Sequence, residues 1–204
     1  KENLDSLSDA YRKIRNTIRY LLVNLHDFNP DKNSMPYAKM QAIDQWALGR
    51  LYGVMKSVLE SYDRYEFAKV YKSVYTFCNE DLSSFYLDIL KDRLYTSGSN
   101  STERRSAQTV LYHILNHLVR VIAPVLCFTA EEIYKEMPKD ADGASTTSVH
   151  LLSWIDCPQD WNNDQIKEQF APLAALRPHV LKALEEARRA GEIGSSLEAK
   201  IVFE

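Results

Sequence analysis

The 204-residue sequence has little glycine, few cysteines and no long apolar run. Six glycines beside twelve tyrosines and three tryptophans argue against a turn-rich all-β chain and favour long elements packed with aromatic side chains. The three cysteines form no CxxC pair, so we expect reduced thiols rather than a disulfide framework or a thiolate metal site. Reduced thiols suit a cytoplasmic protein, and no apolar run is long enough to span a membrane, so we expect no membrane partner.

Motifs for catalysis are also absent. The sequence contains no glycine-rich phosphate loop, no nucleophile elbow, and no cluster of His, Cys or carboxylate residues spaced for a hydrolytic or metal site. We therefore predict no catalytic residue, no metal ligand and no cofactor in this chain. His113 and His117 stand four residues apart, but without an acidic or cysteine partner they make an incomplete metal site. We expect them to flank an apolar stripe instead.

The formal net charge of -3 gives no sign of a nucleic-acid-binding chain as a whole, so any basic site must be a local patch. Residues 11–25 form such a patch, with several cations and no acidic residue. Arg12, Arg15 and Arg19 are three and four residues apart and share one side of a helix, with Asn16 beside them. This face could be solvated and paired with acids elsewhere, or it could bind phosphates and bases, which guanidinium groups match well.

Apolar residues recur at steps of three and four through most of the chain, which predicts helices. The first is expected over residues 4–28, where Asn29-Pro30 ends it, and a later short helix should begin with a capping box at Thr129 and Glu132. The other helices are expected near residues 39–62, 65–95, 107–122 and 164–191. The run to residue 95 is long for a globular domain, so we expect a kink near 79–84.

These patterns predict a mainly α fold. We expect an antiparallel helical bundle over residues 1–148, followed at 149–204 by a junction with one helix and the start of a small α/β region. Alternating apolar residues at 197–203 predict a short strand, for which residues 149–152 are a weak partner. The missing initiator Met and the strand at the far end lead us to expect a fragment. We also expect a monomer.

Four segments resemble, in family order, the anticodon-binding helical domain of bacterial isoleucyl-tRNA synthetases, which are class I aminoacyl-tRNA synthetases. They are residues 10–17 (AYRKIRNT), 81–95 (DLSSFYLDILKDRLY), 104–111 (RRSAQTVL) with 123–124 and 128–133 (FTAEEI), and 193–199 (IGSSLEA). Leucyl, valyl and methionyl relatives share the bundle and the Arg-Asn pair matched by Arg15 and Asn16. Residues 85–95 favour the isoleucyl family.

The resemblance implies a tRNA-recognition fragment of an ATP-dependent isoleucine-tRNA ligase. Its partners would be the tRNA for isoleucine and the remaining domains of the synthetase. Catalysis, with ATP and Mg, and the Zn region would lie in parts absent from this chain, so the fragment itself would be no enzyme. The alternatives are a helical protein-interaction or assembly module and the equivalent domain of a valyl- or leucyl-tRNA synthetase.

The same resemblance ranks the candidate binding residues. Arg15 is the first candidate for contact with the anticodon stem-loop, and the residues on neighbouring turns, Asn16, Arg12 and Arg19, follow. Weaker candidates for contact with the RNA backbone are Arg177, Lys182 and Arg188. Lys91 and Arg93 have two open interpretations: contact with tRNA, or pairing with Asp88 and Asp92 to hold the bundle against the absent catalytic domain.

Overall fold

A computed structural model of the chain describes residues 2–140, 143, 145–195, 198–200 and 202. It comprises two compact units, residues 1–162 and 163–204. The first unit contains α1 (Glu2–Val23), α2 (Pro30–Asn33), η1 (Tyr37–Lys39), α3 (Ala42–Asp63), α4 (Phe67–Thr76), η2 (Phe77–Tyr86), α5 (Leu87–Thr96), α6 (Thr102–Ile122), α7 (Cys127–Glu136), η3 (Val149–Leu151) and η4 (Gln159–Trp161). The second contains α9 (Asp164–Arg189). The division into domains at residue 148 stays a prediction.

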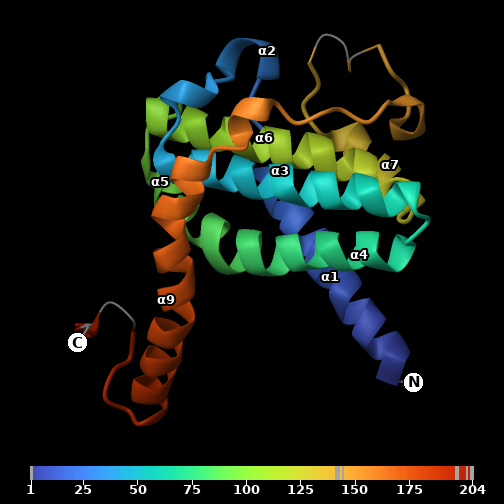
Figure 1. Ribbon diagram of the computed structural model, residues 1–204. Helices are drawn as coiled ribbons and strands as arrows, with labels where there is room; N and C mark the ends of the chain where they lie inside the picture. The colour runs from blue at the N-terminus through green and yellow to red at the C-terminus, as the bar shows by residue number, and fades with distance from the viewer. Residues whose placement is uncertain (1, 141–142, 144, 196–197, 201, 203–204) are drawn as a thin grey trace. The chain divides into compact units, whose positions relative to one another are not determined.

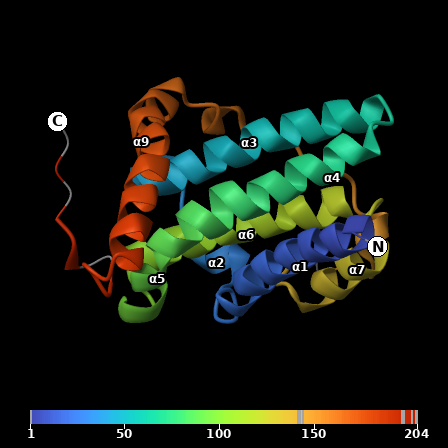
Figure 2. The same ribbon diagram turned by 90° about the horizontal axis from the view of Figure 1, so that it is seen from below.

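The first unit is a helical bundle built around α6 (Figures 1 and 2). Helices α1, α3, α5 and α7 all contact α6, and α3 forms a hairpin with α4. The apolar residues of α6 are buried on several sides, including Val110, Leu111, Ile114, Leu115 and Leu118. Burial of each such side chain stabilises the fold by about 1.5–3 kcal/mol. The predicted mainly α, helical-bundle fold is confirmed.

No strand occurs among the residues that the structure describes. The strand predicted at 197–203 falls largely on residues outside that part, because 197, 201 and 203 are not described. Residues 149–152 were predicted as a weak candidate for the neighbouring strand. This prediction was wrong, since Val149–Leu151 is a 3₁₀ turn capped by the Ser148 hydroxyl. In the described part of the C-terminal region, helix α9 is therefore the main regular element.

Helix α1 follows the predicted apolar spacing through its second half. Ile14, Ile18 and Leu21 are fully or almost fully buried, whereas Leu7 is 56% exposed and does not join the core as expected. The helix ends at Val23 rather than near residue 28, and Leu25 and Phe28 enter the core from the turn that follows. The buried row of α1 fixes which residues of this helix face outward.

The long run from α4 to α5 contains a π-helix, η2, where the sequence predicts a kink. A π-helix carries more residues per turn than an α-helix, so the positions that face the core shift along the sequence. Ile89, which α-helical spacing places inward, is 45% exposed, and Leu90 is buried instead. The prediction for Ile89 was wrong because the spacing rule assumes an unbroken α-helix.

Two predicted helix starts also differ from the structure. Thr129 lies inside α7, which begins at Cys127, and its hydroxyl bonds to the Tyr11 hydroxyl at 3.0 Å, so the capping-box interpretation was wrong. In the second unit the sequence suggests Asp164 as the N-cap of α9, but the N-cap is Asn163, whose side chain accepts from the backbone N–H of Ile166. Apolar side chains expected to face inward along α9 are exposed, including Leu173 and Leu176.

Candidate nucleic-acid interface

The outward face of α1 carries the residues that the sequence analysis ranked first. Ile14, Thr17 and Ile18 are buried against the bundle, so the opposite side of α1 points away from it. Arg12, Arg15, Asn16 and Arg19 are all exposed. The structure therefore presents three guanidinium groups and one carboxamide on neighbouring turns of one helix.

Residues 11–25 contain no acidic residue, but in the structure acidic groups lie beside this face. An Arg15 guanidinium nitrogen lies 3.2 Å from a carboxylate oxygen of Glu132 on α7, and a second nitrogen donates to the Tyr11 hydroxyl at 3.2 Å. The hydrogen bond to Tyr11, followed by the charge of Glu132, raises the pKa of Arg15. Arg12 pairs with Asp9 at 3.4 Å. The expectation of an acid-free surface was thus wrong, because one of these acids comes from a distant helix.

Arg19 differs from its two neighbours. It makes no hydrogen bond or ion pair with any residue in the described part of the chain, and its side chain is exposed. An ion pair on the surface contributes little stability and is easily exchanged for another partner. Arg19 is therefore available at once to an anion, while Arg15 must exchange Glu132 for it.

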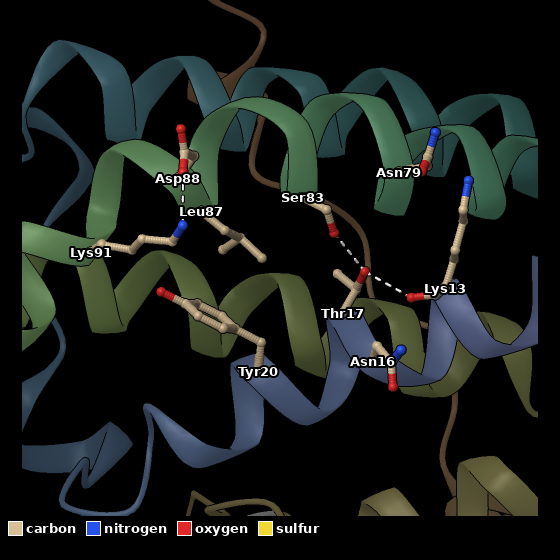
Figure 3. Close-up of a pocket in the computed structure, with 9 residues that line it drawn as sticks. All are labelled: Lys13, Asn16, Thr17, Tyr20, Asn79, Ser83, Leu87, Asp88 and Lys91. Atoms are coloured by element: carbon tan, nitrogen blue, oxygen red, sulfur yellow. Dashed lines mark hydrogen bonds and ion pairs between the residues drawn. The ribbon is translucent and has the colours of Figure 1, made fainter. Parts of the chain in front are cut away.

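Two hollows flank α1. The first, with a cavity volume of about 190 Å³, lies between α1 and α7 and has Arg15 and Arg19 on one wall and Glu132 and Glu136 on the other. The second is larger, about 260 Å³, and lies between α1 and the run formed by η2 and α5 (Figure 3). Asn16 and Lys91 both line this second hollow, so the structure brings together two of the predicted binding residues.

The second hollow is held in shape by a contact between two hydroxyl groups. Thr17, which is buried, lies 2.8 Å from the Ser83 hydroxyl and also donates to the backbone carbonyl of Lys13 (Figure 3). This contact fixes η2 against α1 beneath the opening. Neither hydroxyl group was singled out from the sequence, since the residues are 66 positions apart.

Lys91 and Arg93 have different environments. Lys91 is exposed and pairs with Asp88 at 2.8 Å, as one interpretation expected. Arg93 instead binds both carboxylate oxygens of the fully buried Asp44, at 2.9 and 2.7 Å, and also donates to the Glu103 carbonyl. The expected pair with Asp92 was wrong, and Arg93 lies inside the bundle as part of a buried ion pair.

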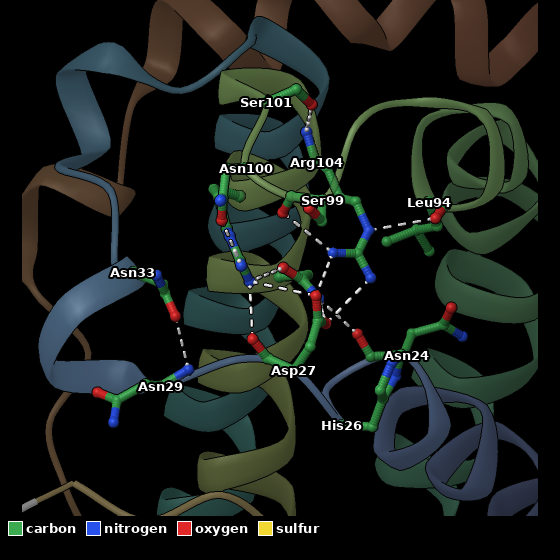
Figure 4. Close-up of polar contacts among 12 residues, drawn as sticks. Asn24, His26, Asp27, Asn29, Asn33, Leu94, Ser99, Asn100, Ser101 and Arg104 are labelled. Atoms are coloured by element: carbon green, nitrogen blue, oxygen red, sulfur yellow. Dashed lines mark hydrogen bonds and ion pairs between the residues drawn. The ribbon is translucent and has the colours of Figure 1, made fainter.

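A second ion-pair network, missed in the sequence, fixes the turn after α1 to the start of α6 (Figure 4). Arg104 is 8% exposed and binds both carboxylate oxygens of Asp27, while Gln108 donates to the same carboxylate at 2.7 Å. Arg105 donates to the Asp27 carbonyl at 3.0 Å. Every one of these groups is used inside the bundle, so the resemblance seen at residues 104–111 reflects architecture rather than a binding surface.

The remaining predicted cations lie on α9, in the second unit. Lys182 lies 3.9 Å from Glu186 and is exposed, Arg188 is exposed, and Arg177 is half-buried. Among the described residues, no three His, Cys, Asp or Glu side chains come together as a metal site. His113 and His117 pack against the Trp161 ring, as the apolar environment predicted for them suggests.

Comparison with known protein families gives a match over most of the chain. Residues 44–203 match the family described as the anticodon-binding domain of tRNA ligase. The chain belongs to this family. The match begins within α3, so α1 lies outside it, but pairwise similarity to individual relatives includes α1 as well.

Relatives of this anticodon-binding domain carry the name isoleucine–tRNA ligase. The protein of Thermoanaerobacter sp. (strain X514) is 49% identical over 201 residues, which are 98% of this chain and 22% of the relative. That of Fervidobacterium nodosum is 45% identical over 204 residues, 100% of this chain and 22% of the relative. That of Thermotoga neapolitana is 44% identical over 200 residues, with 98% and 22% covered. The anticodon-binding domain thus spans about a fifth of the length of these relatives.

None of the helices in the described part of the domain is both long and apolar enough to cross a bilayer. The assignment of individual residues to RNA contacts stays a prediction.

Proposed function

We propose that this chain binds the anticodon stem-loop of the tRNA for isoleucine, as one domain of an isoleucine–tRNA ligase. The observation that carries the proposal is the outward face of α1, where Arg12, Arg15 and Arg19 project in a domain of the anticodon-binding family. Unpaired loop bases can be read by planar side chains, and loop phosphates by cations. The names of the relatives favour isoleucine over valine or leucine as the amino acid.

The proposal extends to the context of the domain. Attachment of isoleucine, with ATP and Mg, and the Zn site are assigned to other domains, because this sequence has no phosphate-binding loop and no cysteine pair. We further propose a cytoplasmic monomer whose partners are this tRNA and the other synthetase domains. Lys91 and the α9 cations Arg177, Lys182 and Arg188 are proposed as additional contacts to the RNA backbone.

Fluorescence anisotropy with labelled tRNA transcripts tests the proposal. The chain should bind the isoleucine transcript, with log K falling by about 0.7–0.9 per phosphate contact as log salt rises. Arg15→Ala and Arg19→Ala should each weaken binding and lower that slope by about one contact. Lys56→Ala is the matched control, since it removes an exposed cation from α3, across the bundle from α1 (Figure 2).

Glu132→Gln separates an RNA surface from a merely solvated one. The substitution keeps the size of the side chain but removes the charge that competes for Arg15. RNA binding at low salt should strengthen a few-fold, in line with the small free energy of an exposed ion pair. If the chain binds no tRNA at any salt, or if Arg15→Ala and Lys56→Ala behave alike, the α1 face is not the binding surface, and a protein-interaction module becomes the better explanation.

A further inference from the structure

The hollow between α1 and the η2–α5 run has features that the exposed cations of α1 lack. Its walls include apolar surface from the Tyr20 ring and from Leu87, and its volume is about 260 Å³. Tyr20 comes from α1 and Leu87 from α5, so the apolar wall spans the two helices (Figure 3). Apolar and aromatic walls with a few polar groups are typical of sites that take a planar organic group rather than a bare phosphate.

The polar groups of this hollow are placed around its opening. Asn16 on α1 and Asn79 on η2 both line the hollow, and neither carboxamide makes a side-chain hydrogen bond within the described part of the chain. A free carboxamide offers both donors and an acceptor, which is the combination that reads the edge of a nucleobase. Ordinary surface amides would be solvated, but these two line the same hollow, so one ligand in it could contact both.

The charges at the opening are arranged at its two ends. Lys13 extends from α1 toward Asn79 at one end, and Lys91 lies at the other end beside Asp88 (Figure 3). The Lys13 ammonium donates to the Tyr75 hydroxyl at 3.3 Å, and it carries no ion pair among the described residues. Two lysines against one aspartate leave the opening net positive. A nucleotide has a phosphate on each side of its sugar, so a cation at each end suits a chain that passes over the opening.

The Tyr20 side chain, which lines the hollow, is partly buried. Burial, followed by the neighbouring Tyr95 and Asp88, raises the pKa of this phenol well above its ordinary value.

We propose that this hollow holds one unpaired nucleotide of the bound RNA, whose base lies against Tyr20 and Leu87 and is read by Asn16 and Asn79, while Lys13 and Lys91 contact its flanking phosphates. The inference rests on the proposed function, and it adds a base-reading subsite on η2 that the cations of α1 do not provide. The π-helical geometry of η2 is part of the site, because Asn79 and Ser83 both belong to η2 and line the hollow.

The test uses the anticodon stem-loop RNA of isoleucine tRNA in which each loop nucleotide in turn is made abasic. With the unchanged chain, removal of one base should weaken binding by about 5- to 150-fold, the range for one base stacked on an aromatic side chain. With Asn79→Ala the same abasic position should lose most of that penalty. Gln41→Ala, which removes an exposed carboxamide at the start of α3, is the matched control and should keep the full penalty.

Two further variants keep the test independent of folding. Asn79→Asp has the same shape but offers only acceptors, so it should change which base is preferred at the sensitive position. Tyr20→Phe keeps the ring and should leave the abasic penalty in place. Unchanged circular dichroism and unfolding midpoints would show that the variants are folded.

The possible outcomes separate the two proposals. If the unchanged chain binds the RNA with the expected salt dependence but no single base matters, or if Asn79→Ala retains the full abasic penalty, the base-reading hollow is overturned and the proposed function stands. If the unchanged chain binds no RNA, the proposed function fails and the hollow is overturned with it. A base-specific penalty that Asn79→Ala removes and Gln41→Ala retains supports the inference.

Discussion

Replacement of Asp27 by Asn should destabilise the bundle in a manner that depends on pH. Asp27 receives hydrogen bonds from Arg104 and Gln108, and Arg105 lies 3.7 Å away (Figure 4). The hydrogen bond from Arg104, followed by that from Gln108 and the charges of the two arginines, lowers the pKa of the carboxyl from 3.8 to about 2, against the opposing effect of burial. Asp27→Asn keeps the shape of the side chain but removes the charge that both arginines face.

The stability lost on Asp27→Asn can be worked out from the lowered pKa of Asp27. A carboxyl whose pKa is lowered from 3.8 to about 2 stabilises the folded state by about 2.4 kcal/mol at neutral pH. The side chain is 28% exposed, so solvent screening reduces the electrostatic part to about 1–2 kcal/mol. Arg104 is nearly buried and would lose its charged acceptor, which adds about 1 kcal/mol or more. We expect Asp27→Asn to lower the free energy of unfolding by about 2–3 kcal/mol at pH 7.

The direction in which the pKa of Asp27 is shifted determines how its contribution to stability depends on pH. Because the folded pKa lies below the unfolded value, the stabilisation is complete above pH 4 and is lost as the pH falls toward 2. The difference between wild type and Asp27→Asn should therefore be constant from pH 7 to about 5 and shrink below 4. Urea unfolding followed by circular dichroism at several pH values measures it. A difference below about 0.5 kcal/mol at pH 7, or one that does not shrink in acid, would refute the reasoning.

Two further predictions concern other buried groups. Tyr86→Phe should lower the free energy of unfolding by about 1–3 kcal/mol, because the fully buried Tyr86 hydroxyl donates to the Asp44 carboxylate at 2.7 Å. Urea unfolding measures this loss, with Tyr112→Phe as the control, because the Tyr112 hydroxyl bonds to the less buried Asp140. Equal losses in the two variants would contradict the prediction. Burial lowers the pKa of His113 and of His117 to about 4, so the unfolded chain takes up protons below pH 6.5 while the folded chain does not. Stability should therefore fall between pH 6.5 and 4, and His113→Gln should flatten this part of the curve; a pH profile identical to wild type would exclude the role of His113.

The helices and much of the core could be predicted because their signals are local. Apolar spacing of three and four residues identified Ile14 and Ile18 as buried, and hence the exposed side of α1 that carries Arg15. The family resemblance rested on short motifs that are also local. These parts of the fold need no knowledge of which helices touch.

The partners of charged groups could not be predicted in the same way. Arg15 and Glu132 are 117 residues apart, and Arg93 and Asp44 are 49 apart, so neither pair leaves a trace in a single helix. Arg93 was grouped with the surface residue Lys91 because the sequence shows that both are cations but not that only one is exposed. The distinction between a buried ion pair and a solvated one depends on packing across the bundle.

The second hollow was equally beyond sequence reasoning, because it depends on the geometry of one irregular segment. Asn79 and Ser83 were considered only as the site of a possible kink. The backbone there continues as a π-helix, and this conformation determines where their side chains lie relative to α1.

The π-helix also sets the rotational phase between the two halves of this long run. Each residue of an α-helix turns the chain by about 100°, so loss of one residue within η2 would rotate α5 by that amount relative to α4. Leu90 and Leu94 would then leave the core, Arg93 would lose Asp44, and Lys91 would turn away from α1. The length of η2 thus sets, at the same time, the position of the buried ion pair on α5 and the position of Lys91 at the hollow beside α1.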